Sequence, residues 1–353
     1  EPVKNGVFLD QEKVAKRIRE ISDEYGLEVD PNSYIKDLPV GLQQRVEIIK
    51  VLYRHADILI LDEPTAVLTP QEVEGLFKII NTLINSGKSI IFITHKLKEV
   101  LAVADDITVL RLGAVVGSID PKEATSEVLA TMMVGRDVNL IVQKQPAKVA
   151  GDVLVVENLF VRDDRQHMTV QGVSFNVRKG EVLGVAGVQG NGQTELVYAL
   201  TGLLPLDSGI IRLLDEPIHH TTPRNILERG VAHIPEDRQR HGLILSFPIH
   251  DNLMLCTYYK NPFAKGISLQ PKSIFSNAEE LVKQYDVRTP NIYVNAGTLS
   301  GGNQQKVIVA REFSRPIELL IASQPTRGLD VGSIEYIHSQ IIKKRDEGTG
   351  VLL

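Results

Sequence analysis

The sequence predicts an α/β protein made of two similar domains, and two observations carry this prediction. Residues 38–65 and 299–326 repeat one pattern without a gap, at an offset of 261 positions (Leu38 to Leu299). Within a copy, short apolar runs alternate with an amphipathic segment, which is the pattern of parallel strands joined by helical crossovers. A repeat this long indicates duplicated domains rather than a solenoid.

The first copy has the clearest strand–helix–strand order. Residues 56–62 (ADILILD) and 88–94 (KSIIFIT) are apolar runs that we expect to form strands buried on both faces. A helix is expected between them, with Thr69 as its N-cap, Pro70 in its first turn and Gly87 at its exit. This order predicts a right-handed parallel crossover.

The repeat also predicts the domain boundaries. Residues 1–137 are expected to be the C-terminal part of a first domain, residues 138–151 a linker, and residues 152–353 most of a second domain. Subtracting the offset from Gly187 places the first domain's phosphate loop upstream of residue 1. The 353 residues carry a net charge of −5, which argues against a nucleic-acid partner, and the single cysteine, Cys256, excludes an intrachain disulfide.

Residues 58–65, ILILDEPT, combine an apolar strand with two carboxylates at its end. Asp62 is placed to hold Mg²⁺ through water, and Glu63 to orient or deprotonate an attacking water. The alternative is a strand that runs into an acidic turn.

Residues 299–306, LSGGNQQK, predict a phosphate contact at the start of a helix. Ser300, Gly301 and Gly302 allow backbone amides to approach an anion, and the helix dipole favours the same anion. A serine-capped helix start is the alternative, but it does not explain the two glycines.

Residues 187–194, GVQGNGQT, match a phosphate loop except at one position, because Gln193 stands where the consensus has lysine. The glycines still allow backbone amides to cradle phosphate. A glycine-rich turn without a ligand is the alternative.

Together with FITH at residues 92–95, these motifs resemble the nucleotide-binding domains of ABC-type ATPases. The resemblance implies tandem P-loop NTPase (RecA-like) domains, each with a helical subdomain and an antiparallel β subdomain, which enclose two ATP molecules with Mg²⁺ head to tail. It also implies that His95 is a switch histidine at the γ-phosphate. The spellings VGLQQR, LSGGNQQK, MVGR and IPEDR resemble the ATPase subunits of monosaccharide and nucleoside importers.

The head-to-tail arrangement of that family implies two unequal ATP sites. Site one would combine the upstream phosphate loop with Asp62, Glu63 and His95, under a lid formed by Ser300, Gly301, Gly302, Asn303 and Gln304. Site two would combine Gly187, Gly190, Asn191, Gly192, Gln193, the metal ligand Thr194 and Glu236 with Gly41 and Gln43 of the first copy. Site two has Ser323 and Gln324 in place of the Asp–Glu pair, and Pro39 and Val40 in its lid. We therefore expect one catalytic and one degenerate site.

The resemblance further implies transmembrane permease subunits as partners, and through them a substrate-binding lipoprotein, at the cytoplasmic face of a prokaryotic plasma membrane. Phe247, Leu253 and Met254 are candidates for the permease contact, with core packing as the alternative. A soluble tandem ABC ATPase acting on ribosomes or DNA is a second hypothesis. An ATP-sensing pseudo-enzyme is a third, against which Asp62, Glu63 and His95 argue. Residues 1–353 alone are expected to have no appreciable ATPase activity.

Overall fold

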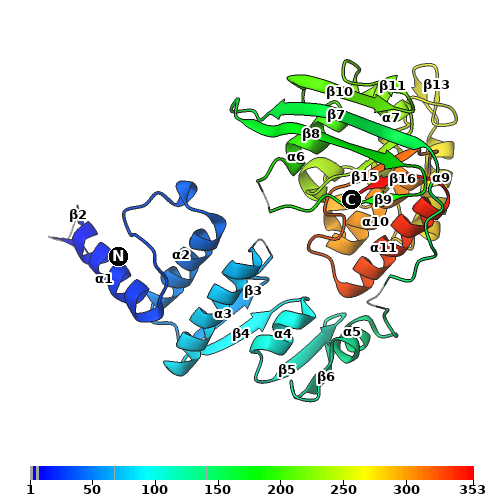
Figure 1. The fold of residues 1–353 in the computed structure, drawn as a ribbon. Helices are drawn as coiled ribbons and strands as arrows, with labels where there is room; N and C mark the ends of the chain where they lie inside the picture. The colour runs from blue at the N-terminus through cyan, green and yellow to red at the C-terminus, as the bar shows by residue number, and fades with distance from the viewer. Residues whose placement is uncertain (1–2, 5–7, 67, 140–141, 189) are drawn as a thin grey trace. The chain divides into compact units, whose positions relative to one another are not determined.

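The computed structural model describes residues 3–4, 8–66, 68–139, 142–188 and 190–353 (Figure 1). The chain divides into two compact units, residues 1–137 (unit 1) and residues 138–353 (unit 2). Each unit has a hydrophobic core of its own. None of the helices in the described ranges is long and apolar enough to cross a membrane.

Unit 1 is an α/β unit whose central strands are parallel. Its elements are β1 (Val3–Lys4), β2 (Phe8–Leu9), α1 (Gln11–Tyr25), η1 (Ile35–Asp37), α2 (Val40–Leu52), β3 (Ile58–Asp62), α3 (Pro70–Asn85), β4 (Ser89–Ile93), α4 (Leu97–Val103), β5 (Ile107–Arg111), β6 (Ala114–Ile119) and α5 (Ser126–Val134). The predicted strand–helix–strand order is confirmed as β3, α3 and β4, and the two strands are parallel neighbours as predicted. Thr69 caps α3 as predicted, in a reciprocal capping box with Glu72.

The core of unit 1 lies on one face of the β3–β4 pair. Helices α1, α2 and α3 pack there around Leu59, which is 1% exposed. The opposite face is apolar but open to solvent, with exposed fractions of 62% for Ile58, 66% for Ile60, 51% for Ile91 and 46% for Ile93. The prediction that both strands are buried on both faces is therefore not met within unit 1, where no described element packs on this second face.

Unit 2 contains two four-stranded sheets. Its elements are β7 (Asp152–Arg162), β8 (Met168–Arg178), β9 (Val182–Leu183), α6 (Gln193–Leu200), β10 (Ser208–Leu213), β11 (Glu216–Pro217), α7 (Pro223–Glu228), β12 (Val231–Ile234), a π-helical turn η2 (Arg238–Gly242), α8 (Ile249–Met254), β13 (Ala264–Lys265), β14 (Ser268–Leu269), α9 (Pro271–Gln284), η3 (Ala296–Thr298), α10 (Gly301–Phe313), β15 (Leu319–Ala322), α11 (Val331–Asp346) and β16 (Gly350–Leu352).

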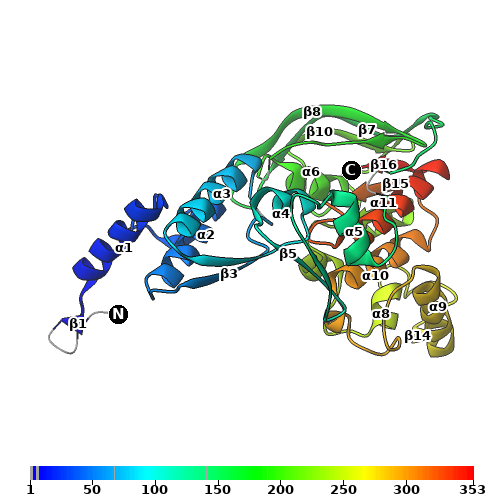
Figure 2. The ribbon, with the colours of Figure 1, turned by 90° about the horizontal axis from the view of Figure 1, so that it is seen from below.

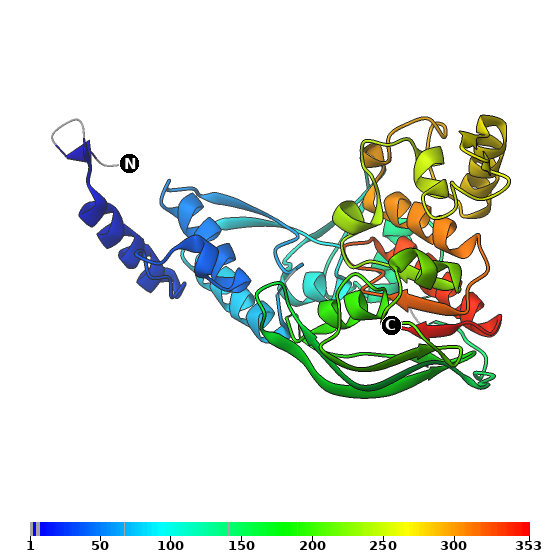
Figure 3. The same cartoon turned by 90° about the horizontal axis from the view of Figure 1, so that it is seen from above.

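The parallel sheet of unit 2, in the order β12–β15–β16–β9, lies between two cores. Leu320 and Ala322 of β15 face the core built with α8 to α11, whereas Leu319 and Ile321 face the core built with α6 and the antiparallel sheet β11–β10–β7–β8. Figure 2 places β7, β8 and β10 on one side of this unit and α8 and α9 on the other, and Figure 3 gives the same layers from above. Both faces of β15 are buried as a result.

The elements of the two repeated regions correspond at the same offset of 261 positions. After that shift α2 and α10 have the same bounds, as do α3 and α11, and η1 and η3. The backbone agrees as well, because Glu63 has a φ of 47° and its counterpart Gln324 a φ of 44°. Positive φ is uncommon outside glycine, so the two copies share one unusual turn after the central strand.

A buried ionic network fixes the end of α10 to β12. Glu312 accepts hydrogen bonds from Arg311 Nε (2.9 Å) and Arg315 Nη2 (2.8 Å), and the same Arg315 nitrogen donates to the Val231 carbonyl at 2.6 Å. Burial opposes the charge of Glu312, but the two guanidinium groups hold the pKa of its carboxyl below the ordinary value. Buried charges are tolerated when paired in this way, and breaking such a pair is costly.

Beside this network, His233 on β12 predicts a pH dependence of stability. Burial lowers the pKa of His233 from 6.5 to about 4. His233 is therefore protonated near pH 6.5 in the unfolded chain but only near pH 4 in the folded chain. As the pH is lowered through this interval, the free energy of unfolding falls by up to roughly 3 kcal/mol, because the unfolded state binds the additional proton. We expect His233→Leu to remove this slope in the full-length protein, measured by hydrogen exchange of the β12 amides in the native state. His167→Gln, at an exposed position, is the control that should keep it. An unchanged slope in His233→Leu would contradict a neutral buried imidazole.

Candidate functional site

The carboxyl ends of β3 and β4 bring two predicted residues of unit 1 together. Because these strands are parallel neighbours, the residues that follow them meet at one edge of the sheet. His95 Nδ1 lies 2.7 Å from Glu63 Oε1, although 32 positions separate them in the sequence. Glu63 Oε2 is buried and has no hydrogen-bond partner within the described part of the chain. Asp62, the last residue of β3, is exposed.

A second set of contacts, which the sequence reasoning missed, fixes the turns that follow Glu63 and His95. Thr65 is 1% exposed and its hydroxyl donates to Glu99 Oε2 at 2.5 Å. Lys96 Nζ donates to the Thr65 carbonyl at 2.8 Å and pairs with Glu99 Oε1 at 3.1 Å. The recurrence of threonine at both repeat positions, Thr65 and Thr326, was the available signal.

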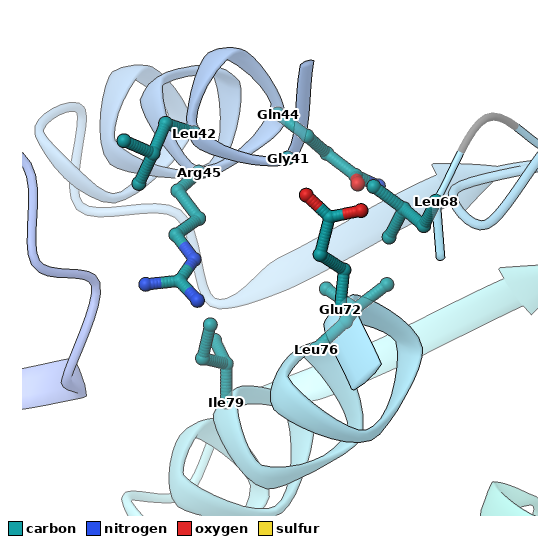
Figure 4. A pocket seen from close by; sticks show the side chains of 8 residues that line it. All are labelled: Gly41, Leu42, Gln44, Arg45, Leu68, Glu72, Leu76 and Ile79. Carbon is teal, nitrogen blue, oxygen red and sulfur yellow. The ribbon is translucent and has the colours of Figure 1, made fainter. Parts of the chain in front are cut away.

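The first signature, residues 38–45, starts α2 and packs closely on α3. A Cβ at Gly41 would lie 2.5 Å from Glu72 Oε1, so only glycine fits there without a shift. Gln43 Nε2 donates to the Leu38 carbonyl at 2.8 Å, inside its own unit. Figure 4 shows Glu72 reaching from α3 toward Gly41 on α2, and both residues line a pocket between these helices.

The two copies differ beside this pocket. Its lining includes Arg45, and the neighbouring position 75 is glycine, with the Arg45 guanidinium 3.6 Å from where its Cβ would be. The counterpart of Gly75 in unit 2 is Tyr336, whose ring lies beneath Lys306 Nζ at 4.8 Å. Beside the basic residue of each signature, Arg45 or Lys306, unit 1 thus has glycine where unit 2 has an aromatic ring.

The second signature forms the start of α10, and its residues Ser300 to Gly302 make up the signature turn. Ser300 is the N-cap residue, but its hydroxyl accepts from Asn303 Nδ2 at 3.0 Å and no side chain caps the described first turn. Asn303 Oδ1 accepts from the Arg288 amide, and Gln304 Nε2 donates to the Ala296 carbonyl. The first amides of α10 therefore keep their capacity to bind an anion.

The signature turn rests on the start of α11. A Cβ at Gly302 would lie 2.3 Å from Ser333 Oγ and 3.2 Å from Asp330 Oδ2. Asp330 in turn accepts from the Ser333 amide (2.9 Å) and hydroxyl (2.7 Å). Gly302 and Ser333 are the counterparts of Gly41 and Glu72, so the same close approach occurs in both units.

The phosphate-loop region of unit 2 runs from β9 into α6. Gly190 and Gly192 have φ values of 91° and 94°, which favour glycine. Gln193 folds back over the loop, since its Nε2 donates to the Val188 carbonyl at 3.1 Å and would lie 2.1 Å from a Cβ at Gly187. Asn191 and Thr194 lie before and within the first turn of α6, and residue 189 is outside the described residues.

The remaining site-two candidates of unit 2 follow neighbouring strands of its parallel sheet. Glu236 comes after β12 and is half-buried, and Ser323 and Gln324 come after β15. The Ser323 hydroxyl is buried without a hydrogen-bond partner in the described ranges. Serine and glutamine at these two places provide no carboxylate, in contrast to Asp62 and Glu63 at the same places of unit 1.

The three candidates for a partner contact separate by burial. Leu253 and Met254 on α8 are 2% and 8% exposed, so both belong to the interior, and the idea that they form a contact surface is wrong. The apolar neighbours of Leu253 on α9 and α10 explain its burial. Phe247 is 43% exposed and stays a candidate.

Comparison with known proteins gives a family and several relatives. A family model described as ABC transporter matches residues 3–66 and 170–327. The "Nucleoside import ATP-binding protein NupA" of Lactococcus lactis subsp. cremoris is 52% identical over 351 residues, which cover 99% of this chain and 69% of that protein. The "Guanosine import ATP-binding protein NupO" of Bacillus subtilis is 48% identical, with 100% and 69% covered. The "Xylose import ATP-binding protein XylG" of Moorella thermoacetica is 38% identical, with 98% and 69% covered.

A solved structure also resembles nearly the whole chain. It is the archaeal ribosome recycling factor aABCE1 in complex with the ribosomal stalk protein aP1, with a TM-score of 0.61 and 20% sequence identity, covering 97% of this chain and 63% of that one. At this identity the likeness is one of fold alone.

The contact between Gly302 and Ser333 predicts the effect of a single methyl group. We expect Gly302→Ala to destabilise the full-length protein by about 1–3 kcal/mol, because overpacking outweighs the helix-propensity gain of up to about 1 kcal/mol. Urea unfolding measures this, with Gly151→Ala as control, since its added methyl meets nothing within 4 Å. Adding Ser333→Ala to Gly302→Ala should restore part of the loss. No recovery in that double variant would contradict the clash.

Proposed function

This chain belongs to the ABC transporter family, whose ATP-binding import proteins are ATPases coupled to transport, and we propose that it is the ATP-hydrolysing motor of a nucleoside importer. The observation that carries the substrate class is its 52% and 48% identity to relatives named for nucleoside and guanosine import, against 44% to one named for glucose and 38% to one named for xylose. Simple sugars are the second candidate, supported by the glucose and xylose relatives.

The proposed catalytic site one uses the residues at the ends of β3 and β4. Glu63 would orient and deprotonate the attacking water, and its second oxygen is free to do so because Oε1 is the one that lies against His95. His95 would hold Glu63 in place and reach the γ-phosphate. The exposed Asp62 would hold Mg²⁺ through water, in keeping with the oxygen ligands that this ion prefers.

The lid of site one is proposed to be the signature turn with Asn303 and Gln304. The uncapped amides at the start of α10 fit a phosphate, as do the two glycines. Bound ATP·Mg²⁺ would supply the phosphoryl group and the cation that neutralises developing charge. The residues of this chain contribute position, a base and hydrogen-bond donors.

Site two is proposed to bind nucleotide weakly and to turn over little. Gln193 provides no charge and its amide already bonds to Val188 within the loop. Ser323 is a poorer ligand for a hard cation than aspartate, and Gln324 cannot serve as a base. Gly187, Gly190, Asn191, Gly192 and Thr194 would retain the backbone cradle, with Glu236 nearby and Gly41 and Gln43 of unit 1 as the lid.

The proposed partners are transmembrane permease subunits, with a substrate-binding lipoprotein attached through them, at the cytoplasmic face of a prokaryotic membrane. The names of the import relatives support the permease, and the exposed Phe247 is the candidate contact. The ribosome-associated alternative is not favoured. The observation in its favour is the similarity of this chain to a ribosome recycling factor, which at 20% identity concerns the fold alone.

The assignment of the two sites predicts opposite effects of two substitutions. Glu63→Gln should lower the ATPase rate of the full-length protein with its membrane partner by about 10²- to 10⁴-fold, because the base is removed. Gln193→Ala should leave most of the activity. Glu74→Gln, at an exposed glutamate on α3 of unit 1, is the matched control. The reverse pattern would overturn the site assignment, and purification with ribosomes instead of membranes would favour the alternative.

The substrate class predicts which uptake depends on this chain. Cells that carry Glu63→Gln in the full-length protein should lose uptake of labelled guanosine while uptake of labelled xylose is unchanged. Competition between labelled guanosine and other unlabelled nucleosides then measures how far the substrate class extends. Loss of xylose uptake with intact guanosine uptake would replace the nucleoside proposal by the sugar proposal.

A further inference from the structure

The π-helical turn η2 is attached to the signature helix α10 at several points. Gln239 Nε2 donates to Gln304 Oε1 at 3.3 Å, and Arg311 Nη1 donates to the Gly242 carbonyl at 2.8 Å. A Cβ at Gly242 would lie 2.5 Å from Ile308 Cδ1, so the backbone of the turn packs closely on this side chain of α10. The segment that follows Glu236 is thereby fixed to α10.

Arg238, the first residue of η2, reaches two other elements of unit 2 at once. Its Nη1 donates to the Arg327 carbonyl at 2.7 Å. Its Nη2 lies against the signature turn, 2.6 Å from where a Cβ of Gly301 would be. One guanidinium thus connects the signature turn with residues 327–330, which lead into α11.

The position of Arg238 is electrostatically unfavourable. Burial lowers the pKa of Arg238, and the charge of Arg327 acts in the same direction against the nearby Asp237. Asp237 directs its Oδ1 to the amides of Gln239 and Arg240. The Nε of Arg238 is buried without a partner among the residues that the structure describes, and the positive end of the α10 dipole is close. A half-buried guanidinium that is incompletely paired is a candidate for a functional role.

The signature turn is therefore held from two sides. Arg238 lies against Gly301, and Ser333 with Asp330 lies against Gly302. Because Arg238 also bonds to Arg327, the turn and the segment 327–330 are tied by a side chain as well as by packing.

We propose that Arg238 is a positioning residue for ATP hydrolysis, which locks the signature turn to residues 327–330 so that both reach the nucleotide of site one as a single rigid piece. This inference rests on the proposed function, in which the signature turn is the lid of that site. Arg238 acts through Gly301 and does not itself touch the nucleotide.

The test uses the full-length protein bound to its membrane subunits. Arg238→Ala should lower kcat/KM for ATP by about 10-fold or more, since misplacing a binding group by about 1 Å has effects of this size. Its Tm should stay within about 2 °C of the parent, because the removed side chain is only partly buried. Arg240→Ala, two positions along the same turn at an exposed arginine, should match the parent. An Arg238→Ala enzyme as active as Arg240→Ala overturns the proposal.

A double variant separates positioning from an independent effect. If Arg238 acts through the signature turn, Arg238→Ala should lower kcat/KM little further when Gly301→Ala is already present. Losses that multiply overturn the proposal. Should Arg238→Ala fail to fold, Arg238→Lys keeps the charge and a donor for the Arg327 carbonyl but loses the second arm. A reduced kcat/KM at unchanged Tm then supports the proposal, and parental turnover overturns it.

Glu63→Gln, measured in parallel, keeps the two proposals apart. If it retains turnover, the assignment of site one fails, and with it the premise of this inference. If it abolishes turnover while Arg238→Ala does not reduce it, only the role of Arg238 is overturned.

Discussion

The close packing of the start of one helix on the start of the next is the constraint on which both halves of this molecule depend. In unit 2 it is the approach of Gly302 to Ser333 and Asp330, and in unit 1 the approach of Gly41 to Glu72. No side chain longer than glycine fits at either contact without displacing its neighbour. The constraint fixes where the signature amides lie relative to the turn that ends the central strand.

This packing is a second reason why the signature positions require glycine. Close approach of backbone amides to phosphate is one reason, and it concerns a ligand. The contacts of Gly301 with Arg238 and of Gly302 with Ser333 concern the protein itself. Gly41 of the first copy makes this second kind of contact too, because a Cβ there would lie 2.5 Å from Glu72 Oε1, although Pro39 and Val40 stand where the second copy has Ser300 and Gly301.

Sequence patterns predicted much of the fold because most of it depends on local signals. The parallel pair β3–β4, the capping box of Thr69 and the helix from Pro70 follow from periodicity and capping chemistry. The exposure of Ile58 and Ile60 was not predictable, because an apolar run does not record which of its faces another layer covers. Glu63 and His95 were named from their motifs, but their 2.7 Å contact needed the strand pairing. Arg238 was missed because its partners, Gly301 and Arg327, are distant in the sequence and offer only backbone.

The two faces of β15 have a consequence for the order in which unit 2 is made. Leu319 and Ile321 pack on α6 and on the sheet that contains β7 and β8, all of which precede β15 by more than a hundred positions. Leu320 and Ala322 pack on α8 to α10, which also come earlier, and on α11, which comes later. During synthesis from the N-terminus, this strand therefore leaves the ribosome when the layer for one face and most of the layer for the other have already been translated. The apolar residues of β15 are therefore made after most of the residues that bury them.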